Sequence, residues 1–385
     1  MFYYISFLRP PPLQSTTYGN IQITPQISND LRTELFDGSA DIFYSWSQTG
    51  GFSSTTAGHN IFTKPNKLTT WRQATAYKEI PVPLPPGARD GQSWRLVLGT
   101  RLTAGRDGFS VIGLHNKDVG QDLFPVMSMP IQFGSRVSKS PKQEQIERMY
   151  RLRPMVGEGA GVVLKLTEQT SFDLDKKVWD SGIGLSSWLV GLEQSIDAED
   201  LVLKLKNVIF SRHSRNVLEL GKNLSAGIGI VGLTLAALRS TRPLNEGAQD
   251  RIIATDLESA IPLIEHNIAA NASHLRNTRL EAAVLDWDDD ALPEILTNTV
   301  LTLSMADVTY NTASFPSLVR TLSNLMKIGK VPPLVLLGYK ERDSTERSLW
   351  DLASDFGLSL QRAGISAGGG GTPVEIWLGQ MTEIS

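Results

Sequence analysis

Four apolar segments in the second half of the chain each end in residues that could bind a ligand. The segment 216–220 leads into Gly221 and then into a glycine-rich turn that contains Gly227 and Gly229. Glycines in such a turn let the backbone bend tightly and let a ligand approach without a clash with Cβ. The other three segments end in acidic residues, whose carboxylates can accept hydrogen bonds from hydroxyls and amines: Asp256, Asp286 and Asp307.

Asp256 ends the second apolar segment, 251–256, at a distance downstream of the glycine-rich turn that suits a carboxylate bonding both hydroxyls of a ribose. The glycine-rich turn, the helix expected after it and Asp256 together predict a cofactor that carries a nucleoside. The alternative is a glycine turn kept only for close packing of a helix on a sheet.

The third and fourth segments end in an acid with an aromatic residue close by. Trp287 could stack on an adenine ring while Asp286 accepts from its exocyclic amine; the alternative is a core tryptophan beside a solvated acidic run. Asp307 and Tyr310 are spaced by three residues, so they would face one pocket if a helical turn begins there. The alternative makes Asp307 a helix cap or a solvated residue.

The elements that must position these residues alternate between apolar strands and amphipathic helices. This alternation predicts a doubly wound α/β domain with a parallel sheet, which binds ligands at the carboxyl ends of its strands. Strands are expected at 216–220, 251–256, 280–287, 300–307 and 333–340, with short runs at 358–363 and 374–378 closing the sheet. Helices are expected at 230–239, 258–271, 314–327 and 345–356.

Residues 1–150 are rich in Pro, Gly, Ser and Thr, and their apolar runs are short. They predict an accessory, partly β region that could dock a substrate, with residues 151–385 forming the α/β domain. No catalytic constellation is found in the accessory region. In this region we expect strands at 93–99 and 108–114, one or two helical turns at 30–36, and loops at 50–65 and 81–91. Just beyond it, we expect a hairpin of 162–166 with 171–174.

Composition narrows the possible functions. The 385 residues include no cysteine, which excludes disulfides, thiolate catalysis and cysteine zinc sites. Lys and Arg number 37 against 40 Asp and Glu, so nucleic acid is not expected as a partner. No apolar run reaches the length of a membrane span, and none of the five histidines has metal-ligand spacing. We therefore expect a cytoplasmic protein with no membrane partner and no metal.

Several of these motifs together resemble the seven-β-strand protein-lysine N-methyltransferases, the group that acts on chaperones, calmodulin and translation elongation factors. The resemblance covers about residues 160–385 and includes Val178-Trp179-Asp180, Val217-Leu-Glu-Leu-Gly221, Gly227-Ile-Gly-Ile-Val-Gly232, Asp256-Leu257, Asp286-Trp287 and Asp307-Val-Thr-Tyr310. It implies a seven-stranded Rossmann-like sheet, S-adenosylmethionine as the cofactor and a protein lysine as the acceptor. The N-terminal region is similar to that of fungal members acting on translation factors, which suggests such a substrate.

The resemblance also implies a role for each residue. Trp179 would pack near the methionine end of the cofactor, and Gly221, Gly227 and Gly229 would line the turn beneath it. Asp256 would hold the ribose, and Trp287 would sit on the adenine with Asp286 beside it. Ala306 would pass close to the cofactor, and Asp307 and Tyr310 would border the lysine channel.

The glycine-rich turn departs from the family pattern in one respect. Lys222–Ser225 separates Glu-Leu-Gly221 from the next small residue, whereas the family runs directly from one to the other. These four residues are either a real bulge or an error in the gene model. A real bulge would loosen a turn that must be tight, and it weakens the assignment of Gly221.

Three other functions fit parts of the pattern. A small-molecule N-methyltransferase could use the same fold. An NAD-dependent oxidoreductase shares the Gly-x-Gly turn and the acidic strand end, although Trp287 and the Asp-x-x-Tyr element argue against it. A non-catalytic interaction protein would result if the Lys222–Ser225 insertion had disabled cofactor binding.

Overall fold

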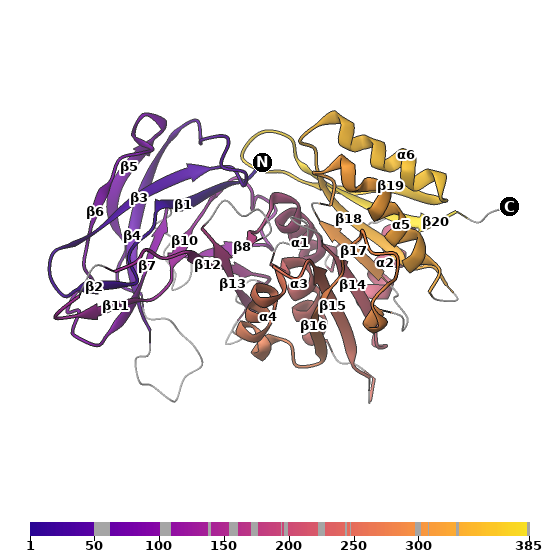
Figure 1. Ribbon diagram of the computed structural model, residues 1–385, viewed down its shortest axis with the longest axis horizontal. Coiled ribbons are helices and arrows are strands. Elements are labelled where there is room, and N and C mark those ends of the chain that lie inside the picture. Colours follow the sequence, from indigo (N-terminus) through magenta and orange to yellow (C-terminus); the bar gives the residue numbers. More distant parts are fainter. Residues whose placement is uncertain are drawn as a thin grey trace.

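The computed structural model describes residues 1–49, 62–100, 109–137, 140–153, 161–170, 176–193, 195, 199–221, 228–242, 245–246, 248–296, 302–306, 308–328 and 331–382. An all-β region formed by β1–β13 lies beside an α/β domain that contains every α-helix of the described residues (Figure 1). We call these two parts the β region and the α/β domain.

The α/β domain is built on a seven-stranded sheet in the order β16-β15-β14-β17-β18-β20-β19. Strands β14 to β18 are parallel, and β20 runs antiparallel between β18 and β19. The bounds are β14 Asn216–Leu220, β15 Asp250–Asp256, β16 Thr278–Val284, β17 Thr302–Ala306, β18 Leu334–Lys340, β19 Leu358–Ser366 and β20 Val374–Met381. The predicted seven-stranded, doubly wound sheet is confirmed.

Helices cover both faces of this sheet, as the strand–helix alternation predicts. Helices α1, α2 and α3 contribute to one apolar cluster, and α5 and α6 contribute to a second cluster. The bounds are α1 Asp180–Leu192, α2 Asp200–Ile209, α3 Ile230–Ser240, α4 Ile261–Ala270, α5 Phe315–Met326 and α6 Ser348–Asp355; the short 3₁₀ helices are η1 Gln73–Thr75, η3 Ala272–His274, η4 Glu294–Leu296, η5 Thr312–Ser314 and η6 Ser344–Arg347.

Helices α1 and α2 were not expected from the sequence. Helix α1 contains several glycines and serines, which are poor helix formers, and it is buried on nearly all sides, so it shows little amphipathic pattern. Helix α2 does carry a helical signal, because its buried residues Val202, Leu205 and Ile209 recur at spacings of three and four.

The β region forms two sheets that share one apolar cluster. One sheet has the order β6-β3-β1-β9; the other has nine strands, with β13-β12-β10-β7-β11-β2 as its main path. The bounds are β1 Tyr3–Arg9, β2 Gln14–Thr16, β3 Asn20–Ser28, β4 Ser39–Thr49, β5 Asn66–Arg72, β6 Ile80–Pro83, β7 Ser93–Gly99, β8 Val111–Gly113, β9 Leu123–Phe124, β10 Val126–Ser128, β11 Ile131–Gly134, β12 Gln145–Arg151 and β13 Val163–Gln169.

Two expectations for the β region were wrong. The loop expected at 81–91 begins as β6, which pairs with β3. The helical turns expected at 30–36 are a tight non-helical turn, because the side-chain oxygen of Asn29 accepts from the backbone N–H groups of Thr33 at 3.0 Å and Glu34 at 3.2 Å. An asparagine side chain that binds the backbone in this way competes with helix formation.

The segment around the expected domain boundary belongs to the β region. Residue 150 lies inside β12, and β12 pairs antiparallel with β13 along its whole length. The strand expected at 162–166 is therefore part of β13. Its expected partner, 171–174, lies outside the described residues.

The β region meets the α/β domain along the edge of its nine-stranded sheet. Asn267 accepts from the N–H of Thr167 at 2.8 Å and donates to its carbonyl at 3.2 Å. Asn271 makes the same pair of hydrogen bonds with Lys165, at 2.9 and 2.8 Å. A helix rises about 6 Å over four residues and a strand about 6.6 Å over two, so the side-chain amides of α4 match the spacing of the β13 backbone.

Across the described part of the chain, no helix has both the length and the apolar character needed to cross a membrane.

Candidate functional site

The carboxyl ends of three neighbouring strands bring together residues that the sequence singles out. Strand β14 lies between β15 and β17, where the strand order changes direction, and ligands bind at such a switch point. Gly221 follows β14, Asp256 ends β15, and Ala306 ends β17. Gly221 and Ala306 are buried, and Asp256 is fully buried.

The glycine-rich turn has a backbone that requires glycine at Gly229. This residue precedes α3 with φ of +80°, in the left-handed region that side chains disfavour. Gly232, in the first turn of α3, must also lack a side chain, since a Cβ there would lie 2.6 Å from Oε2 of Glu219. Gly227 and the insertion Lys222–Ser225 lie outside the described residues.

Glu219 is a buried carboxyl beneath this turn. Its Oε2 accepts from the N–H of Gly232 at 2.9 Å, and no donor among the described residues reaches Oε1. Burial raises the pKa of Glu219 to about 8, and the nearby Asp256 adds to the rise, while hydrogen bonds from the N–H groups of Gly232 and Val231 oppose it. Glu219 belongs to the Leu-Glu-Leu-Gly motif, but no role was predicted for it. An acid in the middle of an otherwise apolar strand is the signal that could have marked it.

Asp256 shares this environment. Its Oδ1 accepts from the N–H of Leu257 at 2.7 Å, and the hydroxyl of the preceding Thr255 donates to the carbonyl of Glu219 at 2.9 Å. Two carboxyl groups thus lie close together at the carboxyl edge of β14 and β15, where they suit a ligand that carries hydroxyls and a cationic amine.

Trp287 and Asp286 follow β16, the next strand outward. The side chain of Trp287 is 1% exposed and packs in the apolar cluster beneath α5, and Arg320 donates to its carbonyl at 2.9 Å. Asp286 is half-buried and accepts from the N–H of Asp288 at 3.0 Å. In this structure the indole is a core residue, as the alternative interpretation had it, and stacking on an adenine stays a prediction.

Tyr310 lies half-buried shortly after β17, while Asp307 lies outside the described residues. The cap of the following 3₁₀ turn, η5, is Asn311, whose side chain accepts from the N–H of Ala313 at 3.2 Å. Ser314, which looks like a helix cap in the sequence, makes no side-chain capping bond to α5.

Trp179 immediately precedes α1 and is 4% exposed. The first turn of α1 packs against the start of α3, because a Cβ on Gly182 would lie 3.0 Å from Cγ2 of Ile230. The structure therefore brings Trp179 to the same end of the sheet as the glycine-rich turn. The guanidinium of Arg342 lies 5.3 Å from the centroid of the Trp179 ring.

The insertion in the glycine-rich turn gives a testable expectation. If Lys222–Ser225 is a strained bulge or an artefact, its deletion should tighten binding of S-adenosylhomocysteine and raise the melting temperature, because an uninterrupted Glu-Leu-Gly-Ala-Gly-Ile-Gly turn remains. Calorimetry and thermal unfolding of the deletion variant measure both. Weaker binding or failure to fold would show that the four residues are a genuine part of the turn.

A seven-stranded sheet with an antiparallel β20 and a glycine-rich turn after its central strand defines the class of S-adenosylmethionine-dependent methyltransferases. The family model for lysine methyltransferases matches residues 159–355, and the chain belongs to that family. S-adenosylmethionine is the cofactor of this family. Oε1 of Glu219 accepts no hydrogen bond from the described residues, and together with the buried Asp256 it fits the amine and hydroxyl groups of this cofactor.

Two curated relatives match parts of the chain. A UPF0665 family protein of Schizosaccharomyces pombe is 30% identical over 181 residues, which are 47% of this chain and 47% of that protein. The calmodulin-lysine N-methyltransferase of Arabidopsis thaliana is 28% identical over 144 residues, 37% of this chain and 43% of that enzyme. The chain thus matches less than half the length of each.

Among solved structures, the magnesium protoporphyrin IX methyltransferase of Synechocystis with bound S-adenosylmethionine covers 49% of this chain and 88% of its own, at 11% identity and a TM-score of 0.29. That likeness is too low to carry an argument about this chain.

Proposed function

We propose that this chain transfers a methyl group from S-adenosylmethionine to a lysine side chain of a protein, with a translation elongation factor as the expected substrate. The observation that carries the proposal is the pair of buried carboxyls, Glu219 and Asp256, beneath the glycine-rich turn of a chain in the lysine methyltransferase family. The similarity to an enzyme named for methylating lysine in calmodulin supports a protein acceptor.

When bound, S-adenosylmethionine supplies an activated methyl group whose leaving group is neutral, so the protein needs little acid–base chemistry. The chain must instead place a neutral amine in line with the methyl group and exclude water. A lysine amine has a pKa near 10.4 in water, so the site must favour loss of its proton. We assign orientation and desolvation of the amine to Asp307 and the shape of the channel to Tyr310.

We assign the cofactor to the residues at the carboxyl edge of the sheet. Asp256 would hold the ribose, Glu219 would face the amine of the methionine end, and Trp179 would pack beside it. The remaining members of the proposed cofactor site are Gly221, Gly227, Gly229, Asp286, Trp287 and Ala306.

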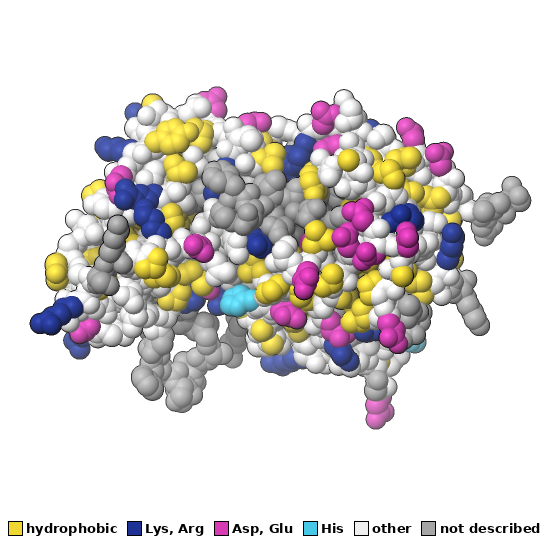
Figure 2. Space-filling model, viewed as in Figure 1, with side chains coloured by type: hydrophobic (Ala, Val, Ile, Leu, Met, Phe, Trp, Pro, Cys, Tyr) yellow, Lys and Arg dark blue, Asp and Glu magenta, His cyan; other side chains and the backbone are white. Residues whose placement is uncertain are grey.

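The charge of the α/β domain suits a cationic acceptor. Residues 171–385 contain 27 Asp and Glu but 19 Lys and Arg, whereas residues 1–170 contain 13 Asp and Glu and 18 Lys and Arg. On the face shown in Figure 2, acidic side chains gather over the α/β domain. A surface of this sign attracts a lysine-bearing segment and speeds its association at low salt.

Cofactor binding should depend on pH through Glu219. Because its pKa is raised to about 8, the unliganded protein holds this carboxyl protonated at pH 6 to 7. A ligand amine bound beside Glu219 favours the ionised carboxylate, so affinity for S-adenosylhomocysteine should rise between pH 6 and 8, by at most about tenfold per pH unit. Calorimetry in two buffers with different ionisation enthalpies should report release of a proton.

Glu219→Gln is the matched control for this pH dependence, since it keeps the shape of the side chain but cannot ionise. It should remove both the pH dependence and the proton release. The effect on stability has the opposite sign: the folded state holds a proton that the unfolded chain loses above its usual pKa of 4.5, so the free energy of unfolding should fall as pH rises from about 4.5 to 8. If the affinity of the unmodified protein for S-adenosylhomocysteine stays constant between pH 6 and 8, Glu219 is excluded from the cofactor site.

The proposed activity is tested by incubating the protein with radiolabelled S-adenosylmethionine and a cell lysate, followed by mass spectrometry of the labelled band. We expect label in a lysine of a translation elongation factor. Label only in small molecules would favour the small-molecule N-methyltransferase. Lack of any thermal stabilisation by saturating S-adenosylhomocysteine would favour the non-catalytic interaction protein.

A further inference from the structure

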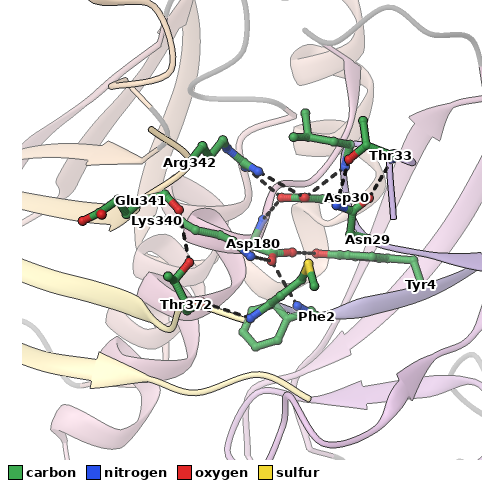
Figure 3. Close-up of polar contacts among 12 residues, drawn as sticks. Phe2, Tyr4, Asn29, Asp30, Thr33, Asp180, Lys340, Glu341, Arg342 and Thr372 are labelled. Carbon is green, nitrogen blue, oxygen red and sulfur yellow. Dashed lines mark hydrogen bonds and ion pairs between the residues drawn. The ribbon is translucent and has the colours of Figure 1, made fainter. Parts of the chain in front are cut away.

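Four charged side chains form a largely buried junction between the β region and the α/β domain (Figure 3). One of them, Arg342, lies over the ring of Trp179. Asp30 comes from the turn after β3, Asp180 is the first residue of α1, Lys340 ends β18, and Arg342 lies two residues later. Two acids face two bases, so the charges balance, and each acid is paired. Pairing of this kind is what allows charges to be buried.

The β region supplies Asp30 to this junction. Asp30 accepts from Arg342 through two hydrogen bonds, at 3.3 Å from Nη1 to Oδ1 and 2.8 Å from Nη2 to Oδ2. Its Oδ2 also accepts from the backbone N–H of Asp180 at 3.2 Å. The turn built on Asn29 holds Asp30 at the end of β3, so the carboxylate is presented from a fixed backbone.

Asp180 anchors the start of α1 through separate partners. Its side chain, fully buried, accepts from Lys340 at 2.6 Å, from the hydroxyl of Tyr4 at 2.8 Å and from the N–H of Phe2 at 3.0 Å. Both strands β1 and β18 therefore fix the helix start. Trp179 directly precedes this helix start, and its ring lies under the guanidinium of Arg342.

Arg342 connects the junction to Trp179. Its guanidinium lies 5.3 Å from the centroid of the indole ring, within the range of an attractive cation–π contact. A guanidinium bound to a carboxylate through two hydrogen bonds is held in one plane, which a lysine at the same position could not reproduce. The orientation of the indole thus depends on a side chain whose position depends on Asp30.

We propose that Arg342 is a positioning residue for the cofactor, and that Asp30 acts through it, so that the β region completes the cofactor site. This inference rests on the proposed function, which places Trp179 against the methionine end of S-adenosylmethionine. It gives the β region a role in cofactor binding in addition to any role in docking a protein substrate.

The test is titration calorimetry of the full chain with S-adenosylhomocysteine, without any methyl acceptor. Arg342→Lys and Asp30→Asn should each weaken binding by about tenfold or more, the scale of a lost cation–π contact. Because Asp30 acts through Arg342, the double variant should bind S-adenosylhomocysteine no more weakly than whichever single variant has the lower affinity. Should Asp30→Asn fail to fold, Arg342→Lys decides the question, since it keeps the charge and an ion pair with Asp30.

Asn271→Ala is the matched control, because it breaks another contact between the same two parts. Asn271 bonds the backbone of Lys165 and not the junction, so its loss should lower the melting temperature but change the affinity for S-adenosylhomocysteine by less than about twofold. An equal loss of affinity in Asn271→Ala would show general loosening and overturn the inference. Unchanged affinity in both Arg342→Lys and Asp30→Asn would also overturn the inference. If the unmodified protein binds no S-adenosylhomocysteine, the proposed function itself is overturned.

Discussion

Asp307→Ala should lower the rate of methyl transfer by about 100-fold or more, because a misplaced amine loses the in-line geometry that the reaction needs. The expectation rests on position: Asp307 directly follows Ala306, which ends β17 at the edge where β14 and β15 present Gly221 and Asp256. A residue that acts on the acceptor stabilises the transition state rather than the bound cofactor. Affinity for S-adenosylhomocysteine should therefore change by less than about 1 kcal/mol.

Tyr310→Phe serves as the milder companion of Asp307→Ala, since the ring that shapes the channel remains. Calorimetry with S-adenosylhomocysteine and mass spectrometry of the methylated substrate should be run on both variants. Full activity in Asp307→Ala would remove this residue from the site. A large loss of cofactor affinity would instead move Asp307 into the cofactor pocket.

Asp256→Ala should weaken binding of S-adenosylmethionine roughly 30- to 150-fold. The estimate corresponds to about 2–3 kcal/mol for the loss of a charge-assisted contact to two ribose hydroxyls. Calorimetry measures the effect directly. An unchanged dissociation constant would exclude Asp256 from the ribose site.

Asp250→Ala provides the control for Asp256→Ala, because it removes a buried acid from the opposite end of the same strand. Asp250 pairs with the buried Arg239, so its loss should destabilise the fold by about 3–5 kcal/mol. It should lower the melting temperature more than Asp256→Ala does, yet leave cofactor affinity nearly unchanged in the folded protein. Equal losses of affinity in the two variants would show that Asp256 acts through stability alone.

The parallel sheet could be predicted because its strands are buried on both faces and so appear as largely apolar runs, most clearly in β18. The same apolar runs also predicted which acidic residues and glycines stand at the ends of the strands. Helix α1 could not be predicted in this way, since a helix buried on nearly all sides loses its amphipathic period. The β region was underestimated because many of its strands are short and rich in polar residues.

The place of the candidate site residues in the fold could be predicted where it depends on local sequence, and not where it depends on distant contacts. Gly229 and Asp256 lie at strand and helix ends that the pattern marks. The contact of Asp30 with Arg342 joins residues 312 positions apart, and nothing near either residue signals the other. The motif alone could not decide the role of Trp287, because a tryptophan can either stack on an adenine ring or pack in the core.

The asparagine side chains of α4 have a consequence for how this protein can be divided. An edge strand with open N–H and carbonyl groups is a template for pairing with another chain, and proteins commonly protect such edges. Here β13 is the outer strand of its sheet, and Asn267 and Asn271 occupy the backbone groups of Thr167 and Lys165 that a further strand would use. A fragment that ends after β13 would lack α4 and expose these backbone groups, so we expect the β region to self-associate when it is separated from the α/β domain.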